Sequence, residues 1–334
     1  MGVFWDFLTK PRSFFEHLYD VYKEYPNEPA VGIGSFFTPC LYVRDPLNIQ
    51  HVLASDFNSF YHRGIEPNEG DVLAETVLFL NGKKWKLVRQ SMTPLFTSTK
   101  LKNICVSLQS GGKLKDPETG YELDPTDELL AAQAFFFFIA GVEPTASAIF
   151  AALVELGKYS EIQRKLHEEI DQTFEENGGK MTYDIVVNMK YLDMVMNEAM
   201  RMHPPIGFLT RKCTKDTVLP NGNIKVEKGT KILTAIYELH HDPKYYPDPE
   251  VFDPERFSRD NKNSTIDMTY MPFGKGGRIC VGMRYAQLQA KSGVLYLLRH
   301  FSLKTITYQG KSTYSKEQVQ VRLNNVDVEF TPRF

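Results

Sequence analysis

The sequence predicts a mainly α-helical fold with small β-sheets. Two long apolar stretches, Thr126 to about Leu156 and Met283 to Phe301, have the length and composition of packed helices. Between them, Asn221-Gly222 and Lys228-Gly229 mark turns between short apolar runs, which is typical of a small sheet. The chain has 334 residues, 42% of them hydrophobic, so it can bury a large core in one or two domains.

Charge and cysteine content narrow the possible functions. The formal net charge of −2 favours no polyanionic partner, so we expect no nucleic-acid binding. The cysteines lie far apart without paired spacing, which fits neither a disulfide framework nor a Cys-x-x-Cys zinc site. They are Cys40, Cys105, Cys213 and Cys280. A reducing compartment is the simplest interpretation.

No membrane anchor is predicted. Charged residues interrupt any apolar run at the N-terminus, which argues against a signal peptide. The longest apolar stretch, Leu129 to Val142, is too short to span a bilayer and leads into Glu143 and Pro144. We therefore expect membrane contact to be peripheral at most.

The N-terminal part of the chain predicts a helix followed by a hairpin. Residues 4–25 alternate apolar and charged positions with helical spacing. Ala30 to Val43 predicts two short strands with a turn near Thr38-Pro39. Asp45-Pro46 then begins a helix that we expect to continue through about residue 53.

A tryptophan and an arginine share one helix face further on. Trp85 and Arg89 are four residues apart in a basic helical stretch, so both side chains project to the same side. A guanidinium presents a planar fork of donors that suits a carboxylate. A polar, glycine-bearing segment from Ser107 to Asp124 then leads into the central helix, with Thr126 as its expected N-cap.

The central helix contains a proline in the run Ala140-Gly141-Val142-Glu143-Pro144-Thr145. Proline removes one backbone donor and is expected to kink the helix. The helix is apolar nearly all round, so we expect it to be buried. After it, Glu198 and Arg201 form a Glu-x-x-Arg pair shortly before Pro204-Pro205, and by itself such a pair is common on helix surfaces.

The stretch from Pro272 to Gly282 crowds glycines around one cysteine and leads into the last helix. Glycines allow the backbone to pass close to something flat and bulky. Phe273 can pack on a thiolate, Arg278 supplies a cation, and the amides of the following helix favour negative charge. Cys280 is therefore a candidate metal ligand, the alternative being a small buried hydrophobic residue.

The pattern Phe-x-x-Gly-x-Arg-x-Cys-x-Gly in this stretch resembles the haem-binding loop of cytochromes P450, and the Trp-x-x-x-Arg and Glu-x-x-Arg pairs resemble two further motifs of that family. The resemblance covers roughly residues 10–104 and 113–334. It is strongest to microsomal P450s of animals, above all the xenobiotic-metabolising kind of insects. It implies a P450 fold that binds haem b (iron protoporphyrin IX) through the thiolate of Cys280.

The resemblance also implies which residues surround the haem. Arg278, Arg211, Trp85 and Arg89 match positions that hold the haem propionates, and Arg63 lies in a loop that reaches a propionate in several relatives. The full implied set of cofactor-binding residues is Cys280, Phe273, Gly274, Arg278, Gly282, Trp85, Arg89, Arg211, Arg63, Ala140 and Gly141. Ile206, Phe208 and Leu209, in a strand expected from Ile206 to Thr214, are implied to face the substrate.

The same resemblance implies catalytic and structural roles elsewhere. Small Ala140 and Gly141 leave room for a ligand on the oxygen side, with Glu143 feeding a proton relay and Thr145 as the nearby hydroxyl. The family places threonine directly after that acid, whereas this chain has Pro144, and Thr145 is rotated by about 100° on the helix. Glu198, Arg201 and Arg256 are implied to form a buried network that locks the haem-side core.

The chain departs from the family after residue 103, where relatives continue through helices that cap the substrate cavity. We expect these distal-lid helices to be missing, as a splice variant or a faulty gene model would leave the chain. Three parts are predicted: an N-terminal β-rich lobe with the Trp-x-x-x-Arg helix (1–104), a junction that replaces the missing helices (105–125), and a haem-binding helical core with a small sheet and the cysteine loop (126–334). The N-terminal anchor of microsomal relatives is not visible.

The function implied is a haem-thiolate monooxygenase that inserts one oxygen atom from O2 into an apolar small molecule. Electrons would come from NADPH through NADPH-cytochrome P450 reductase, at the microsomal membrane of the endoplasmic reticulum, with Lys86, Lys275 and Arg284 able to meet an acidic reductase surface. Two alternatives stay open: a haem-thiolate isomerase or peroxygenase, which Pro144 would suit, and a truncated, impaired or non-functional haem-binding isoform. We expect such a truncated chain to hold haem poorly and to couple oxygen use inefficiently.

Overall fold

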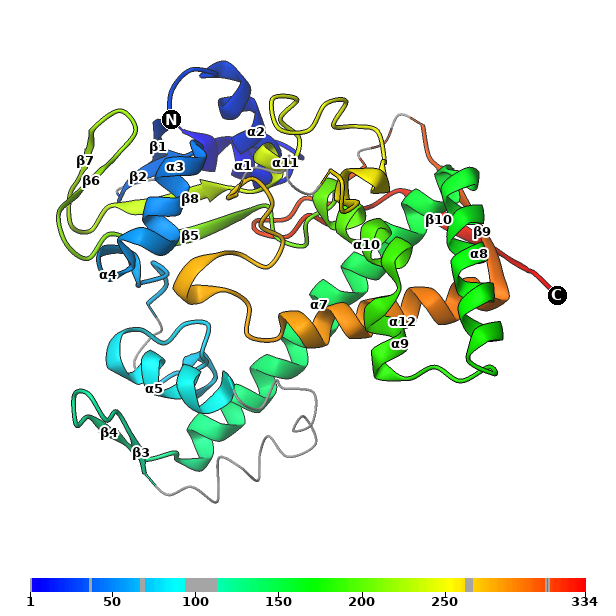
Figure 1. Cartoon of the computed structure of the whole chain (residues 1–334). Helices are drawn as coiled ribbons and strands as arrows, with labels where there is room; N and C mark the ends of the chain where they lie inside the picture. Colours follow the sequence, from blue (N-terminus) through cyan, green and yellow to red (C-terminus); the bar gives the residue numbers. More distant parts are fainter. Residues whose placement is uncertain are drawn as a thin grey trace.

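The computed structural model describes residues 2–35, 38–66, 70–93, 113–261, 267–309, 311 and 313–334. The described residues form a sheet-bearing lobe beside a group of long helices, with a smaller unit around helix α5 (Figure 1). Helices dominate and the sheets are small, which confirms the predicted fold class.

The sheet-bearing lobe is built on four strands in the order β1-β2-β8-β5. β2 and β8 run parallel, and the two outer pairs are antiparallel. The strands are β1 (Ala30–Ser35), β2 (Thr38–Val43), β8 (Lys231–Ala235) and β5 (Phe208–Lys212). The expected turn near Thr38-Pro39 was placed too late, because both residues already lie in β2. The sheet thus joins the start of the chain to its second half.

The first helix is split, contrary to the prediction of a single helix over 4–25. The two pieces are α1 (Val3–Thr9) and α2 (Phe14–Glu24). Pro11 lies between them and cannot donate to a helix ladder. A new start follows at Ser13, which forms a capping box with Glu16.

Two helical segments follow the hairpin. α3 (Pro46–Gln50) begins after Asp45, whose carboxylate accepts the N–H of Asn48, and a π-helical turn (His51–Ser55) and α4 (Phe57–Phe60) continue it. α5 (Gly82–Met92) forms the core of the smaller unit. Against it lies the hairpin of β3 (Leu114–Lys115) and β4 (Glu122–Leu123).

The longest helix is α7 (Asp127–Lys158), which starts where the sequence predicts it: the Thr126 hydroxyl accepts the N–H of Leu129 at 3.3 Å. Four other helices accompany it, namely α8 (Ser160–Glu176), α9 (Tyr183–Asn188), α10 (Lys190–Met202) and α12 (Met283–His300). The end of α7 shares a buried apolar cluster with α8, α10 and α12, which includes Leu156, Leu166 and Leu295.

The middle of α7 is exposed on one face, so the prediction of a helix buried all along its length is wrong. Its buried residues lie near its start, at Leu129 and Ala132, and in its second half. Ala151, Ala152 and Leu156 are at most 1% exposed. Phe138 is 71% exposed, and its neighbours Phe135, Ile139 and Val142 are exposed too. These four occupy one helix face by their spacing. Among the described residues, α7 is also the helix that is long and apolar enough to cross a bilayer, by length and composition alone.

Short elements complete the fold. β6 (Thr217–Leu219) and β7 (Ile224–Val226) form the hairpin predicted at Asn221-Gly222, where Gly222 adopts a φ of 83°. Single turns of helix lie at Val72–Ala74, Tyr237–His240 (α11), Pro254–Phe257 and Gly276–Arg278. β9 (Phe301–Thr307) and β10 (Val326–Pro332) pair antiparallel at the C-terminal end, as the alternating tail predicts.

Candidate functional site

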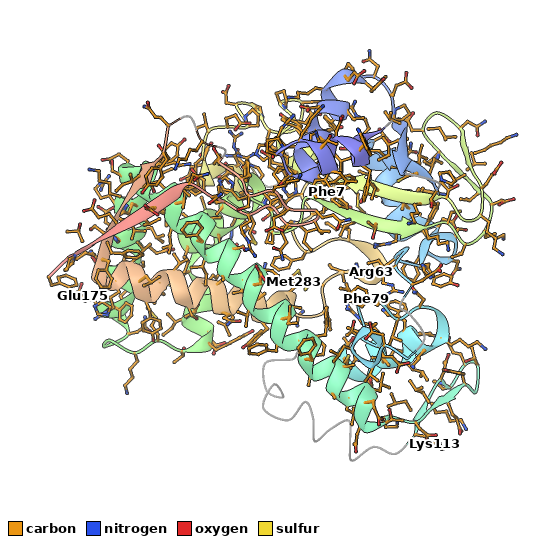
Figure 2. The ribbon with its side chains drawn as sticks, turned by 180° about the vertical axis from the view of Figure 1, so that it is seen from behind. Phe7, Arg63, Phe79, Lys113, Glu175 and Met283 are labelled. Atoms are coloured by element: carbon orange, nitrogen blue, oxygen red, sulfur yellow. The ribbon has the colours of Figure 1, made fainter. Side chains whose placement is uncertain are left out.

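A cavity of about 620 Å³ lies where α7, α10, α12 and the sheet-bearing lobe meet the α5 unit. Its walls are mainly apolar, and its size is typical of a small-molecule site. Arg63, one of the lining residues, is labelled in Figure 2, which shows the chain and its side chains from behind. Of the residues that the sequence singled out, all of the expected cofactor-binding set except Arg211 line this cavity.

Cys280 presents its thiol to the cavity. The loop that carries it is closed by a hydrogen bond of 3.0 Å from the Cys280 N–H to the Phe273 carbonyl. Cys280 is exposed, but the surface that it exposes lies inside the cavity. Burial there raises the pKa of the thiol, whereas the N–H of Gly282 and the guanidinium groups of Arg89 and Arg63 act to lower it. Burial has the larger effect, so the pKa of the thiol is raised overall, and these donors and cations offset part of that rise.

The glycines of the loop make room for neighbouring backbone and side chains. Gly276 has a φ of 72°, and a Cβ there would lie 1.8 Å from the carbonyl oxygen of Leu53. A Cβ at Gly277 would lie 2.7 Å from the ring of Phe57. Gly276 therefore leaves room for the backbone of the π-helical turn, and Gly277 for the flat ring of Phe57 on α4.

Arg278 ties the cysteine loop to the α5 unit. Its guanidinium carbon lies 4.0 Å from the centroid of the Trp85 ring. The same side chain donates to the carbonyl oxygens of Tyr61 and Leu80, at 3.0 Å each. It is 4% exposed, and its Nη1 has no hydrogen-bond partner among the described residues. These contacts thus fix the position of the Arg278 guanidinium, while its Nη1 can still donate a hydrogen bond to a bound ligand.

Four guanidinium groups gather on this side of the cavity, and within the described ranges none of them forms an ion pair. They belong to Arg63, Arg89, Arg211 and Arg278. Burial and mutual repulsion lower the pKa of Arg278 to about 8, that of Arg211 to about 9 and that of Arg63 to about 10. Arg211 lies behind the wall, 1% exposed, beside Arg63.

The buried donors of this cluster are not all used. Arg89 donates to the Ile279 carbonyl at 2.7 Å, but the Nε atoms of Arg63 and Arg211 have no hydrogen-bond partner among the described residues. Buried cations without anions are costly and are normally paired. The arrangement therefore fits a bound group that carries negative charge next to an apolar body, which is what a haem with its two propionates supplies.

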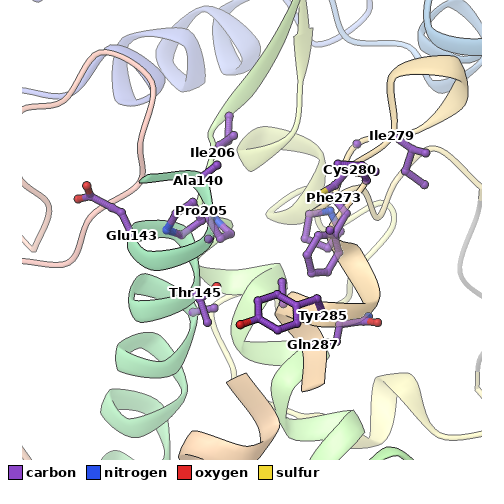
Figure 3. Close-up of a pocket in the computed structure, with 18 of the residues that line it drawn as sticks. Ala140, Glu143, Thr145, Pro205, Ile206, Phe273, Ile279, Cys280, Tyr285 and Gln287 are labelled. Atoms are coloured by element: carbon purple, nitrogen blue, oxygen red, sulfur yellow. The ribbon is translucent and has the colours of Figure 1, made fainter. Parts of the chain in front are cut away.

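The α7 wall faces the cysteine loop across the cavity (Figure 3). Ala140, Gly141, Pro144 and Thr145 line it, and a Cβ added at Gly141 would meet no atom within 4 Å. Glu143 points away from Cys280 and forms an ion pair with Arg322, so the carboxylate expected to relay protons is engaged at the edge of the cavity (Figure 3). Sequence patterns carry no signal for this long-range pairing.

The predicted acid–guanidinium network is assembled below the cavity. Arg201 donates to both oxygens of Glu198, at 2.7 and 2.9 Å, and both side chains are fully buried. Arg256 approaches the same carboxylate at 3.4 Å, and the Asp253 N–H donates to it at 3.0 Å. Arg201 also donates to the carbonyls of His240 and Pro249. Every oxygen of the carboxylate is thereby satisfied.

Some cavity residues differ from the expected set. Phe208 is 5% exposed and packs on Phe14 in the lobe instead of lining the cavity, because it faces the opposite side of β5 from Leu209. Cavity residues that the sequence did not indicate include Val77, Leu78, Phe136, Phe137, Met196, Met200, Tyr285 and Gln287. The run of phenylalanines in α7 is the one signal that pointed to an apolar wall.

Comparison with known proteins identifies the family. The model of the cytochrome P450 family matches residues 108–330, about two thirds of the chain. Cytochrome P450 6j1 of Blattella germanica is 30% identical, with 89% of this chain and 83% of that protein covered. Cytochrome P450 9e2 of the same species is 28% identical, over 90% of this chain and 84% of that protein. A probable cytochrome P450 6a14 of Drosophila melanogaster is 33% identical, over 81% and 57% respectively.

The fold and the cavity thus define a haem enzyme of the thiolate-ligated class. The chain belongs to the cytochrome P450 family, and its relatives are insect P450s. Members of this family are haem-thiolate monooxygenases that contain haem b, so by resemblance this chain is a monooxygenase.

Proposed function

We propose that the cavity holds haem b with the Cys280 thiolate as its iron ligand. The chain would insert one oxygen atom from O2 into an apolar small molecule, with electrons from NADPH through NADPH-cytochrome P450 reductase. The observation that carries this proposal is the thiol of Cys280, exposed into an apolar cavity beside guanidinium groups that lack anions among the described residues.

The arginine cluster supplies the donors for the propionates. Arg63, Arg89 and Arg278 present forked donors at the cavity, and Trp85 adds an indole ring beside them. Arg211 would contribute positive charge from behind Arg63. When bound, the haem supplies the oxygen chemistry, which a thiolate ligand promotes by donating electron density.

The residues of this chain then perform binding, orientation and proton transfer. The Gly282 N–H and Arg89 stabilise the thiolate form of Cys280. Phe273 lies beside Cys280 (Figure 3), and its apolar ring would help to keep water away from the sulfur. Across the cavity, Ala140 and Gly141 leave space for O2 and substrate, and Ile206 and Leu209 contribute apolar substrate contacts. Glu143 can deliver protons inward only after it leaves Arg322.

The Glu198–Arg201–Arg256 network would hold the haem-side core in place without touching the substrate. Its buried carboxylate fixes α10 to the segment that contains Asp253 and Arg256. α10 in turn lines the cavity through Met196 and Met200. Displacement of this network would therefore move one wall of the site.

We further propose that this chain lacks lid helices between the N-terminal lobe and the helical core. The alignment with cytochrome P450 9e2 runs over 451 positions, while 90% of 334 residues is about 300, so about 150 positions face gaps in this chain. The family match begins at residue 108, within the junction at 105–125. The exposed apolar face of α7 is consistent with missing partners. The expected result is weak haem retention and poorly coupled turnover.

Docking to the reductase and to the microsomal membrane is also proposed. Of the three basic residues expected to meet the reductase, Lys86 is paired with Glu118 at 2.7 Å and Lys275 with Asp267 at 2.8 Å. An acidic reductase surface would compete with these exposed pairs, which are weak in water. Location at the endoplasmic reticulum and a role in xenobiotic metabolism follow from the insect relatives as expectations.

A second function, a peroxygenase that needs no reductase, is favoured by two observations. Pro144 stands where the family has its threonine, and Glu143 faces away from Cys280 toward Arg322. Both features weaken the proton path that a reductase-driven monooxygenase needs. A peroxide brings its own protons and electrons.

The test compares two ways of driving the haem-loaded chain. O-deethylation of 7-ethoxycoumarin is measured with NADPH and reductase, and separately with cumene hydroperoxide. Cys280→Ala is measured beside Cys213→Ala, which removes a buried cysteine that does not line the cavity. Turnover that requires reductase and Cys280 supports the monooxygenase; turnover with hydroperoxide alone supports the peroxygenase. Equal turnover in the wild type and Cys280→Ala would overturn both.

A further inference from the structure

Pro144 changes the hydrogen bonding of the cavity wall as well as its shape. In an α-helix the N–H of each residue donates to the carbonyl four residues earlier. Pro144 lies inside α7 and has no N–H, so the carbonyl of Ala140 loses its intrahelical donor. The proline ring also crowds that carbonyl and tilts it away from the helix axis. Both residues line the cavity.

No described side chain replaces the missing donor. The neighbouring Glu143 is engaged with Arg322 and points away from the cysteine loop. The wall is open at the next residue, because a Cβ at Gly141 would meet no atom outside its own stretch of helix within 4 Å. A carbonyl in a mainly apolar cavity without a donor carries a free-energy cost until something supplies one.

We propose that the Ala140 carbonyl oxygen is a ligand-recognition group that Pro144 creates, and that it selects apolar molecules carrying a hydroxyl. This inference rests on the proposed function for the place of the chemistry and goes beyond it by naming the substrate class. A carbonyl oxygen only accepts, so it binds an alcohol or a hydroperoxide and gives nothing to a ketone or a hydrocarbon. The Thr145 hydroxyl both donates and accepts, so it does not discriminate in this way.

The proposal predicts how the preference responds to mutation. Pro144→Ala restores the N–H, which occupies the Ala140 carbonyl. The ligands are 1-indanol, 1-indanone and indane, which share one skeleton. We expect the preference for 1-indanol over indane, expressed as a ratio of dissociation constants, to fall about fivefold in Pro144→Ala, the value of one net hydrogen bond. The affinity for 1-indanone should change little.

Two controls separate the carbonyl from its surroundings. Gly141→Ala adds a methyl group to the same wall and leaves the helix hydrogen bonds intact, so it should weaken all three ligands alike. Thr145→Val removes the neighbouring hydroxyl and should keep the preference for the alcohol. Pro144→Thr serves as a second variant that restores the N–H, and melting curves establish that each variant is folded.

Binding is measured by calorimetry on the haem-free chain and by Soret difference spectra on the haem-loaded chain. Loss of the alcohol preference in both Pro144 variants, with its retention in Thr145→Val, supports the proposal. An unchanged ratio, an equal loss in Gly141→Ala or Thr145→Val, or no binding of 1-indanol to either form overturns it. Failure to take up haem would contradict the proposed function alone, since the calorimetric test does not need haem.

Discussion

The guanidinium of Arg278 lies over the indole ring of Trp85, with its carbon 4.0 Å from the ring centroid. This contact joins the cysteine loop to α5, two segments far apart in the sequence. It also brings a buried cation to a place where Arg63, Arg89 and Arg211 already repel it, which together with burial lowers its pKa to about 8. The haem-free chain therefore stores electrostatic repulsion that an anionic ligand relieves.

Removal of one of these charges should have opposite effects on the free and the haem-bound chain. In Arg63→Met the haem-free protein should melt a few degrees higher, because repulsion and burial of a cation are lost. Its affinity for haem should fall about tenfold, because one charge-assisted hydrogen bond to a carboxylate is lost. Scanning fluorimetry and haem titration measure the two quantities.

The matched control for this prediction is Arg164→Met on α8. Arg164 is exposed and pairs with Glu161 and Glu168, away from the cavity. Arg164→Met removes the same charge as Arg63→Met, but we expect it to change neither the melting temperature of the haem-free chain nor the affinity for haem. A fall in both the melting temperature and the haem affinity of Arg63→Met would mean that Arg63 is a structural residue.

The buried carboxylate of Glu198 makes the helical core sensitive to changes at Arg201. Arg201→Met leaves that carboxylate buried with only Arg256 and one backbone N–H near it. We expect a loss of about 3–5 kcal/mol in the free energy of unfolding, measured by urea denaturation at neutral pH. A loss no larger than that of Arg164→Met would show that water reaches the pair.

Glu238 of α11 predicts a pH dependence of stability. Burial raises the pKa of this carboxyl to about 8, and the Tyr42 hydroxyl and Arg44 offset only part of that shift. The folded chain then holds a proton that the unfolded chain releases near pH 4.5, so stability falls as the pH rises from about 4.5 to 8. Glu238→Gln cannot release a proton and should be more stable than the wild type at pH 8.

The measurement is the urea midpoint of both proteins at pH 5, 6.5 and 8. The difference in stability between the two proteins should grow with pH and level off above pH 8, where Glu238 of the wild type is ionised in both states. Histidine titrations are common to both proteins, so they cancel in this difference. A difference that stays constant over this range would mean that Glu238 is ionised in the fold.

Substitution by alanine should destabilise the chain by different amounts at two glycines of the cysteine loop. Both have positive φ values, 71° at Gly274 and 72° at Gly276, where alanine costs about 1–2 kcal/mol. A Cβ at Gly274 is 3.5 Å from Leu209, but one at Gly276 collides with the Leu53 carbonyl oxygen. Gly276→Ala should therefore destabilise the chain more than Gly274→Ala in thermal melts. Equal melting temperatures would contradict the loop geometry.

Local patterns were sufficient to predict much of the fold. The cap at Thr126, the helical spacing of Trp85 and Arg89, and the turn at Asn221-Gly222 each depend on a few neighbouring residues. The break at Pro11 follows equally local rules, but the amphipathic pattern across it concealed two helices. A period of 3.6 residues persists through a short interruption and does not report it.

Long-range geometry was harder to predict. The ion pair of Glu143 with Arg322 and the contact of Gly276 with Leu53 join segments with no shared pattern. The exposed face of α7 was missed for another reason, because an apolar helix indicates a buried one only if its partners are present. The positions of Cys280 and the arginines on one cavity were indicated by resemblance, whereas composition or periodicity alone gives no sign of them.

The most direct test of the central claim is the carbon monoxide difference spectrum of the reduced, haem-loaded chain. It is recorded for the wild type, for Cys280→Ser and for Cys213→Ser as the control. We expect a strongly red-shifted Soret band in the wild type and in Cys213→Ser, and its loss in Cys280→Ser, because a thiolate ligand gives the haem this signature. An unshifted band in the wild type, or a red-shifted band that survives in Cys280→Ser, would contradict ligation of the haem by Cys280.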